Sequence, residues 1–237
     1  MNYDALINYI HTTPLTWLIA TLAAFKLGII IYEKFNKHTL LQPIIIAYVI
    51  LLSLIIYTNT SFEEYFKSVE IIHFFLGPAT VALALPLYKN LNYVKTLFIP
   101  IALTLVIAGV FSVAIAVALL WIFGADLPTI LSMTTKSITA PIAIITSQQI
   151  GGIPSLAVGF VLITGIIGAL FGTIVFKLAR VKYETSKGFA LGLVSHGIGT
   201  ARAIEISEKA AAFGALAMGL SGIFTAVFLP MIITFFK

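Results

Sequence analysis

Long apolar runs separated by short polar segments dominate the hydrophobic pattern of this chain. Five runs of about 18 residues or more match the length that a helix needs to cross a hydrocarbon core of about 30 Å. They cover Leu15–Tyr32, Leu40–Tyr57, Leu97–Phe123, Leu156–Leu178 and Ala211–Phe236. A sixth run, Ile71–Tyr88, is interrupted by Gly77, Pro78 and Pro86. The pattern predicts about six transmembrane helices.

These runs predict an all-α polytopic membrane protein, because only helices and closed barrels span bilayers and the runs are too long and too uniformly apolar for barrel strands. The composition agrees: 60% of the 237 residues are hydrophobic and 10% are charged, and the mean hydropathy is +1.08. We expect one membrane domain over residues 1–237. The N-terminal segment lacks a basic region and a small-residue cleavage site, so we do not expect a signal peptide.

The charges predict an orientation. Basic residues follow three of the runs: Lys34 and Lys37, then Lys89 and Lys95, then Lys177, Arg180, Lys182 and Lys187. The positive-inside rule places all of these loops in the cytoplasm. The acidic residues Asp4, Glu63, Glu64 and Glu70 fall on the other side, so the N-terminus is expected outside. The basic pI therefore reflects topology, and we expect no nucleic-acid partner.

The predicted sides of the loops require two segments to enter and leave the membrane on the same face. The chain is outside after the fourth span, and the run Leu156–Leu178 must also begin outside so that the basic loop after it lies inside. Residues 127–152 are too apolar for a water-exposed loop and are broken by polar residues and glycines, so we interpret them as a re-entrant hairpin with about ten helical residues per arm. Residues 188–210 are interpreted as a second hairpin that enters from the inside. The alternative is that each segment is an ordinary span. The resulting division is a scaffold of four spans (15–123), a hairpin with span five (127–178) and a hairpin with span six (188–236).

An internal repeat supports the two hairpins. With a shift of 60 residues, the segment from Thr135 aligns with the segment from Ser195. Identical residues pair Ile138, Ala143, Ile144, Ser147, Leu156, Ala157, Gly159 and Ile163 with positions 198, 203, 204, 207, 216, 217, 219 and 223. One crossing separates the two units, which gives them opposite orientations. Inverted repeats with broken helices are typical of secondary transporters, whose sites lie where the breaks meet.

The scarce polar groups gather at the predicted hairpin tips. The segment SHGIGTARAIE (195–205) places a histidine, an arginine and a glutamate on a glycine-rich stretch. Half-helix N-termini favour anions, and arginine can hold a carboxylate through two hydrogen bonds. We predict contacts to a small carboxylate substrate from Lys136, Ser137, Thr139, Ser195, His196, Gly197, Gly199, Thr200 and Arg202.

Structural explanations remain for most of these residues. Lys136 and Arg202 could extend to the interface or pair with Glu205 and Glu208, and an Arg202–Glu205 pair is favoured because the two are three residues apart. His196 could be a buried core histidine. The hydroxyl residues could cap half-helices.

Two further roles follow from the same pattern. His196, Glu205 and Glu208 are candidates for proton coupling, because imidazole ordinarily titrates near neutral pH and a membrane-embedded carboxylate can take up a proton. Gly77, Pro78, Thr80 and Pro141 could line the wall of the cavity, although the first three could also only kink their span.

The sequence gives no sign of catalysis. Ser195 and His196 are neighbours in the chain and should point apart, so they do not make a nucleophile and base. Cysteine is absent, and no metal-ligand spacing or phosphate-binding loop appears. We expect no enzyme activity, no cofactor and no metal.

Four segments resemble the LrgB/CidB family of antiholin-like bacterial membrane proteins, which also includes the plastidic glycolate/glycerate translocator. They are LGPATVALALPLY (76–88), KSITAPIA (136–143), IGGIPSL (150–156) and SHGIGTARAIE (195–205). The resemblance begins at about residue 15. It implies a bacterial cytoplasmic (inner) membrane protein, and we expect a homodimer.

The resemblance leaves two functions open. One is export or exchange of glycolate, glycerate, pyruvate or similar monocarboxylates. The other is control of murein hydrolase release and lysis, together with a small holin-like partner of the LrgA/CidA kind. One departure is Gln148 in TSQQIGG, where the family is expected to carry a glutamate. The second repeat keeps Glu208, so a mechanism that needs an acid in both hairpins does not fit this chain.

Overall fold

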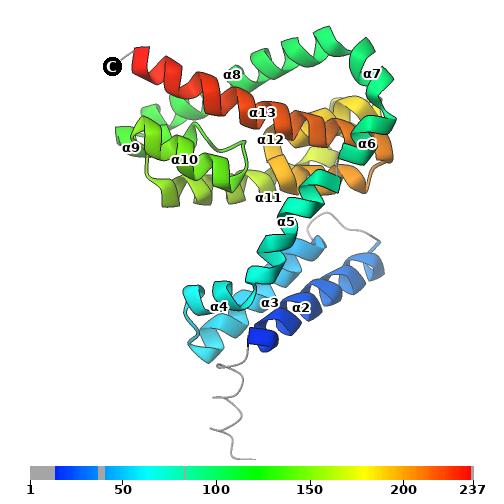
Figure 1. The fold of residues 1–237 in the computed structure, drawn as a ribbon, viewed down its shortest axis with the longest axis vertical. Coiled ribbons are helices and arrows are strands. Elements are labelled where there is room, and N and C mark those ends of the chain that lie inside the picture. The colour runs from blue at the N-terminus through cyan, green and yellow to red at the C-terminus, as the bar shows by residue number, and fades with distance from the viewer. Residues whose placement is uncertain (1–13, 37–40, 83, 236–237) are drawn as a thin grey trace, which may run out of the picture. The chain divides into compact units, whose positions relative to one another are not determined.

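The computed structural model describes residues 14–36, 41–82 and 84–235, and every regular element among them is a helix (Figure 1). Asp4 and Lys37, which contributed to the predicted orientation, lie outside these residues. The chain divides into two compact units, Met1–Ala82 and Leu83–Lys237, which are described separately.

The first unit is a small group of helices: α2 (Pro14–Lys34), α3 (Pro43–Thr58), α4 (Phe62–Ser68) and α5 (Glu70–Ala82). Helices α2 and α3 lie side by side (Figure 1). They approach closely where α3 begins, because a Cβ at Gly28 would lie 2.6 Å from the Pro43 carbonyl oxygen. Trp17 of α2 packs edge-on against Tyr65 of α4, with ring centroids 5.5 Å apart.

The second unit holds the remaining helices. They are α6 (Ala84–Lys89), α7 (Leu91–Thr96), α8 (Phe98–Ile122), α9 (Leu127–Met133), α10 (Ala140–Ile150), α11 (Pro154–Leu178), α12 (Glu184–Ile204) and α13 (Glu208–Phe235). Helix α12 lies between α11 and α13 and contacts both, while α13 also contacts α6, α8 and α10. This unit contains both predicted hairpins.

Four described helices are long and apolar enough to cross a membrane: Leu15–Lys34, Phe98–Ile122, Pro154–Leu178 and Glu208–Phe235. They coincide with the predicted runs Leu15–Tyr32, Leu97–Phe123, Leu156–Leu178 and Ala211–Phe236. The run Leu40–Tyr57 forms the shorter α3, of 16 residues, and Ile71–Tyr88 is divided between α5 and α6. The protein is therefore an all-α, multi-pass membrane protein, and the predicted count of six spans stays a prediction.

Glycines allow α12 to approach both neighbours closely, with backbone against backbone on the side of α13. A Cβ at Gly188 or Gly192 would overlap the carbonyl groups of Ala210 or Gly214 in α13. On the opposite side, a Cβ at Gly168 of α11 would overlap the Ser195 side chain. Small residues at such contacts are how membrane helices approach each other closely. Helix α12 is therefore held tightly between α11 and α13.

Candidate functional site

Helix α12 is broken at Ser195 and His196. The backbone angles there are non-helical, with φ −119° and ψ 15° at Ser195 and φ 40° and ψ −125° at His196. The chain folds back on itself at this break, because a Cβ at Gly199 would overlap the Leu191 carbonyl oxygen. A positive φ at a residue with a side chain costs free energy and persists only where the surroundings enforce it.

The break directs two polar side chains toward α11. A Cβ at Gly165 would lie 2.9 Å from His196 Cε1, so the imidazole fits against this glycine. Ser195 and His196 are both buried. Ser195 Oγ and His196 Nδ1 have no hydrogen-bond partner among the described residues. A buried polar atom without a partner is costly, so a polar group that bonded these two atoms would be stabilising.

The first predicted hairpin differs from its expected form. Helix α9 has only 7 residues, and a non-helical turn over residues 134–139 connects it to α10, which has 11. Two equal helical arms were therefore the wrong description. Hydroxyl groups hold the turn, because Thr134 Oγ1 donates to the Leu131 carbonyl and Thr135 Oγ1 donates to the Ser132 carbonyl. Such side-chain bonds compete with helix continuation.

Lys136 lies in this turn and is buried, with 7% of its surface exposed. Its Nζ donates to Ser112 Oγ of α8 at 2.8 Å and to Ser137 Oγ at 3.1 Å. No acidic side chain of the described residues pairs with it. A buried ammonium is costly without a paired anion. The arrangement therefore favours an anionic ligand beside Lys136.

A cavity of about 290 Å³ lies among α8, the 134–139 turn, α12 and α13. Most of its lining is apolar. The hydroxyl groups in the lining come from Ser112, Thr134, Ser137, Ser221 and Thr225. Leu193 and Val194, which immediately precede the break in α12, also line it. The cavity thus joins the surroundings of Lys136 to the break in α12, and its volume suits a small solute.

Both predicted hairpin tips pack against α11. Ile138 of the first tip packs in a buried cluster with Val161, and His196 of the second tip lies against Gly165. Val161 and Gly165 are about one helical turn apart. None of the described contacts joins Lys136 to His196 directly. The predicted convergence of the two tips on one site therefore stays a prediction.

The acidic candidates lie away from the cavity. Arg202 of α12 forms an ion pair with Glu205, the residue that follows the helix, as their spacing of three favoured. Glu208 pairs with Lys89 at 2.9 Å, and both side chains are more than half exposed. Arg202, Glu205 and Glu208 do not line the cavity, and neither do Lys136, Ser195 and His196. Of the predicted contact residues, Ser137 is the one in its lining.

The LrgB-like family profile matches residues 21–235. This chain belongs to the LrgB-like family. It is 32% identical over 223 residues to the antiholin-like protein LrgB of Bacillus mycoides strain KBAB4 and to that of Bacillus cereus strain B4264. Each alignment covers 94% of this chain and 97% of the relative. No solved structure matches the chain.

Gln148 and Glu208 of this LrgB-like protein are equivalent positions of the two repeats, but only Glu208 is an acid. Gln148 is exposed in the last turn of α10, and Glu208 is exposed in the first turn of α13. Replacing an acid by an amide at such an exposed position removes a surface charge. The departure at Gln148 therefore leaves the polar groups around the cavity unchanged.

The other predicted residues of this LrgB-like protein have varied surroundings. Thr139 precedes α10 without a capping side-chain bond, and Pro141 stands in the first turn. Thr200 Oγ1 donates to the His196 carbonyl at 2.8 Å. Gly197 is exposed, with open space around the position of a Cβ.

The candidates for the cavity wall from the run Ile71–Tyr88 lie in the first unit. Pro78 is an exposed residue inside α5. The surroundings of Gly77 and of the Thr80 side chain lie outside the described part of the structure. Their predicted role stays a prediction.

Sequence reasoning missed four hydroxyl residues of the cavity, namely Ser112, Thr134, Ser221 and Thr225. All but Thr134 are isolated polar residues in a long apolar run. The available signal was their presence in spans that are otherwise almost wholly apolar, where a hydroxyl group needs a partner.

Proposed function

We propose that this LrgB-like protein carries small monocarboxylates across the bacterial cytoplasmic membrane by alternating access. The observation that supports this function is one cavity bordered by both the buried Lys136 turn and the break in α12. Irregular backbone and a buried cation are tolerated in a membrane protein where they line a solute site.

The polar and apolar parts of the cavity suit the two ends of such a substrate. The carboxylate is placed near Lys136, with Ser112 and Ser137 as further hydrogen-bond donors. Ser195 Oγ and His196 Nδ1 lie against α11 rather than in the lining of the cavity, so on this proposal they reach a 2-hydroxy or 2-oxo group only after the break in α12 moves. The apolar walls contributed by α8 and α13 contact the carbon chain.

The membrane topology of this proposal follows the repeat. The α9–α10 segment and α12 are re-entrant hairpins, and α11 and α13 are the spans that follow them. The N-terminus lies outside, and the protein is a homodimer. Movement of the hairpins opens the cavity to each side in turn, as in other carriers with inverted repeats. Proton coupling is assigned to His196, the titratable candidate that is buried at the break.

The test is uptake of labelled glycolate, glycerate and pyruvate into proteoliposomes that hold this chain alone. Saturable uptake should be lost in Lys136→Gln and kept in Lys95→Gln, because Lys95 is an exposed lysine of α7. Arg202→Ala tests whether the site extends to the ion pair with Glu205. Equal uptake by wild type and Lys136→Gln would contradict the proposal.

A second function is favoured by the names of the relatives, which are antiholin-like proteins. The names support this function more directly than they support transport. On this proposal the chain restrains a small holin-like membrane partner and so limits murein hydrolase release. It predicts stable co-purification with that partner and no saturable solute flux by the chain alone. Measuring flux with and without the partner separates the two functions.

A further inference from the structure

A second cavity, of about 420 Å³, lies where α11 ends and α12 begins. Four cationic side chains contribute to its lining: Lys177, Arg180, Lys182 and Lys187. The remaining lining residues are Thr173, Phe176, Val181 and Ile206. The pocket is thus strongly basic on part of its wall and apolar on the rest.

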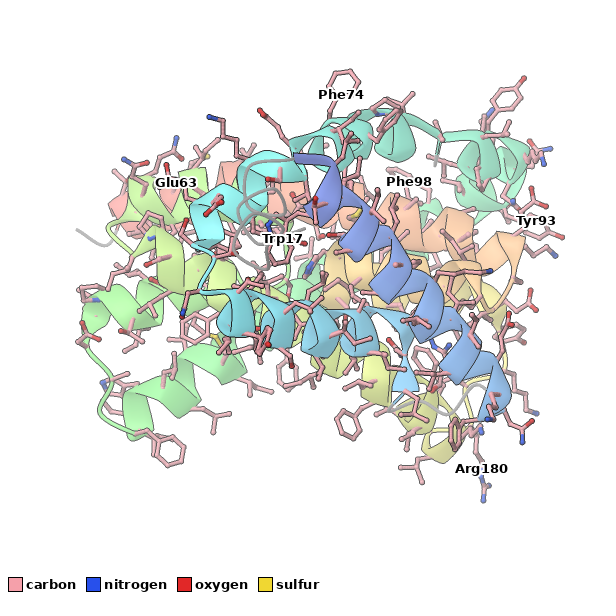
Figure 2. All side chains as sticks on the ribbon, turned by 90° about the horizontal axis from the view of Figure 1, so that it is seen from below. Trp17, Glu63, Phe74, Tyr93, Phe98 and Arg180 are labelled. Carbon is pink, nitrogen blue, oxygen red and sulfur yellow. The ribbon has the colours of Figure 1, made fainter. Side chains whose placement is uncertain are left out.

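The backbone fixes Arg180 at this pocket. The Arg180 amide donates to the Lys177 carbonyl at 3.2 Å, and the Val181 amide donates to the Phe176 carbonyl at 2.9 Å. These two bonds are the pattern of a Schellman motif, which ends a helix with one residue in the left-handed conformation. Glycine is usual at that position, but here Arg180 occupies it with φ 53°. Figure 2 shows its side chain extending away from the ribbon.

The four cations lack acidic partners. Within the described part of the chain, none of them forms an ion pair. Glu184 is the acidic residue closest to them in sequence, and its carboxylate accepts a hydrogen bond from Ser207 Oγ at 2.9 Å. Like charges gathered around one hollow repel each other, and a bound anion offsets that repulsion.

The position of the pocket points to a lipid rather than a free anion. Helix α11 has 25 residues and is about 37 Å long, enough to cross the hydrocarbon core. Its last turns expose Ile174, Val175 and Leu178, which acyl chains would cover. The pocket therefore lies at the level of the lipid phosphates. Basic pockets beside transmembrane helices on the cytoplasmic side are typical sites for anionic headgroups.

We infer that this pocket binds the phosphate headgroup of an anionic phospholipid, with the acyl chains lying along the exposed apolar face of α11. The guanidinium of Arg180 is suited to two hydrogen bonds with phosphate oxygens. Phe176 and Val181 contact the glycerol and upper acyl carbons. The site is separate from the cavity beside Lys136, and the inference holds whether the chain transports a solute or restrains a partner.

The test measures thermal unfolding of the full chain in detergent, with phosphatidylglycerol, phosphatidylcholine or soluble glycerol phosphate added. Phosphatidylglycerol should raise the Tm of the wild type, and phosphatidylcholine should not. The double variant Arg180→Gln/Lys187→Gln should bind phosphatidylglycerol roughly tenfold more weakly or worse, because each basic residue near an anionic headgroup contributes to binding. The matched control Lys34→Gln/Lys95→Gln removes the same charge outside the pocket and should behave as wild type.

Native mass spectrometry gives a second readout. The wild type and the control should retain phosphatidylglycerol, and the pocket variant should lose it. If the double variant does not fold, Lys182→Gln alone replaces it, with a smaller loss expected. Equal binding by the pocket variant and the control, or equal stabilisation by phosphatidylcholine, would overturn the inference. Equal stabilisation by glycerol phosphate at the same concentration would overturn the assignment to a lipid.

Discussion

Lys136 in the α9–α10 turn donates a hydrogen bond to Ser112 in the middle of α8, with 2.8 Å between Nζ and Oγ. This bond joins the first hairpin to a helix long enough to span the membrane. Both of the residues to which Lys136 donates, Ser112 and Ser137, also line the same cavity. The cation is thus held beside the cavity by groups that a carboxylate could share.

Substituting Ser112 tests this relationship without removing the charge. We expect Ser112→Ala to raise the KM for the transported carboxylate by roughly tenfold, because a hydrogen bond to a charged group contributes about 1.5–3 kcal/mol. Ser53→Ala is the matched control, since Ser53 Oγ is exposed and donates only to the Val49 carbonyl one turn away in α3. Uptake kinetics in proteoliposomes measure both. An unchanged KM in Ser112→Ala would separate this hydroxyl from substrate binding.

Two glycines of α11 allow a comparison within one helix. Gly168→Ala should lower the Tm by several degrees, because a Cβ there overlaps the Ser195 side chain at the break. Gly159→Ala should leave the Tm unchanged or raise it slightly, since a Cβ at Gly159 meets open space and alanine is the better helix former. Thermal unfolding in the same detergent compares them. Equal Tm values would argue against the tight α11–α12 contact.

The positive φ at His196 predicts an unusual order of stability. His196→Gly should be at least as stable as His196→Ala, because glycine adopts this backbone conformation without the cost that a Cβ brings. In an ordinary buried helix position the order would be reversed. Both variants should lose solute uptake if the imidazole contacts substrate. Unfolding curves and uptake assays on the same samples separate the backbone effect from the side-chain effect.

The surface pair between Lys89 and Glu208 should matter little. Both side chains are more than half exposed, so Glu208→Gln should change the free energy of unfolding by less than about 1 kcal/mol. We also expect the pH profile of uptake to stay as in wild type, since Glu208 does not line the cavity. A changed pH profile in Glu208→Gln would instead assign proton coupling to this carboxylate.

Hydrophobicity alone located the long helices. The run Leu97–Phe123 became α8 (Phe98–Ile122), and Leu156–Leu178 lies within α11. Their bounds were predictable because an uninterrupted apolar run has no competing local signal. The segment 127–152 was less predictable, because the hydroxyl side chains of its turn bond to nearby carbonyl groups and end α9 early.

The sequence placed the break of α12 in the correct segment but attributed it to the glycines alone. The glycines of SHGIGTAR suggested where the backbone could turn, yet the non-helical angles fall on Ser195 and His196. Gly199 instead permits the close approach to Leu191 after the chain has folded back. The sequence marks Ser221 and Thr225 as polar residues in an apolar run, but it does not place them at the cavity, because only the fold brings α13 beside the 134–139 turn.

The glycine contacts of α12 have a consequence for the tolerance of this chain to substitution. At Gly188 and Gly192 the neighbouring atoms are backbone carbonyl groups of α13, which cannot rotate aside as a side chain would. A saturation library should therefore accept no other residue at these two positions. By contrast, a Cβ at Gly219 of α13 meets open space, and this position should accept alanine and larger apolar residues. The pattern of permitted substitutions would then trace, residue by residue, the faces along which α12 is enclosed.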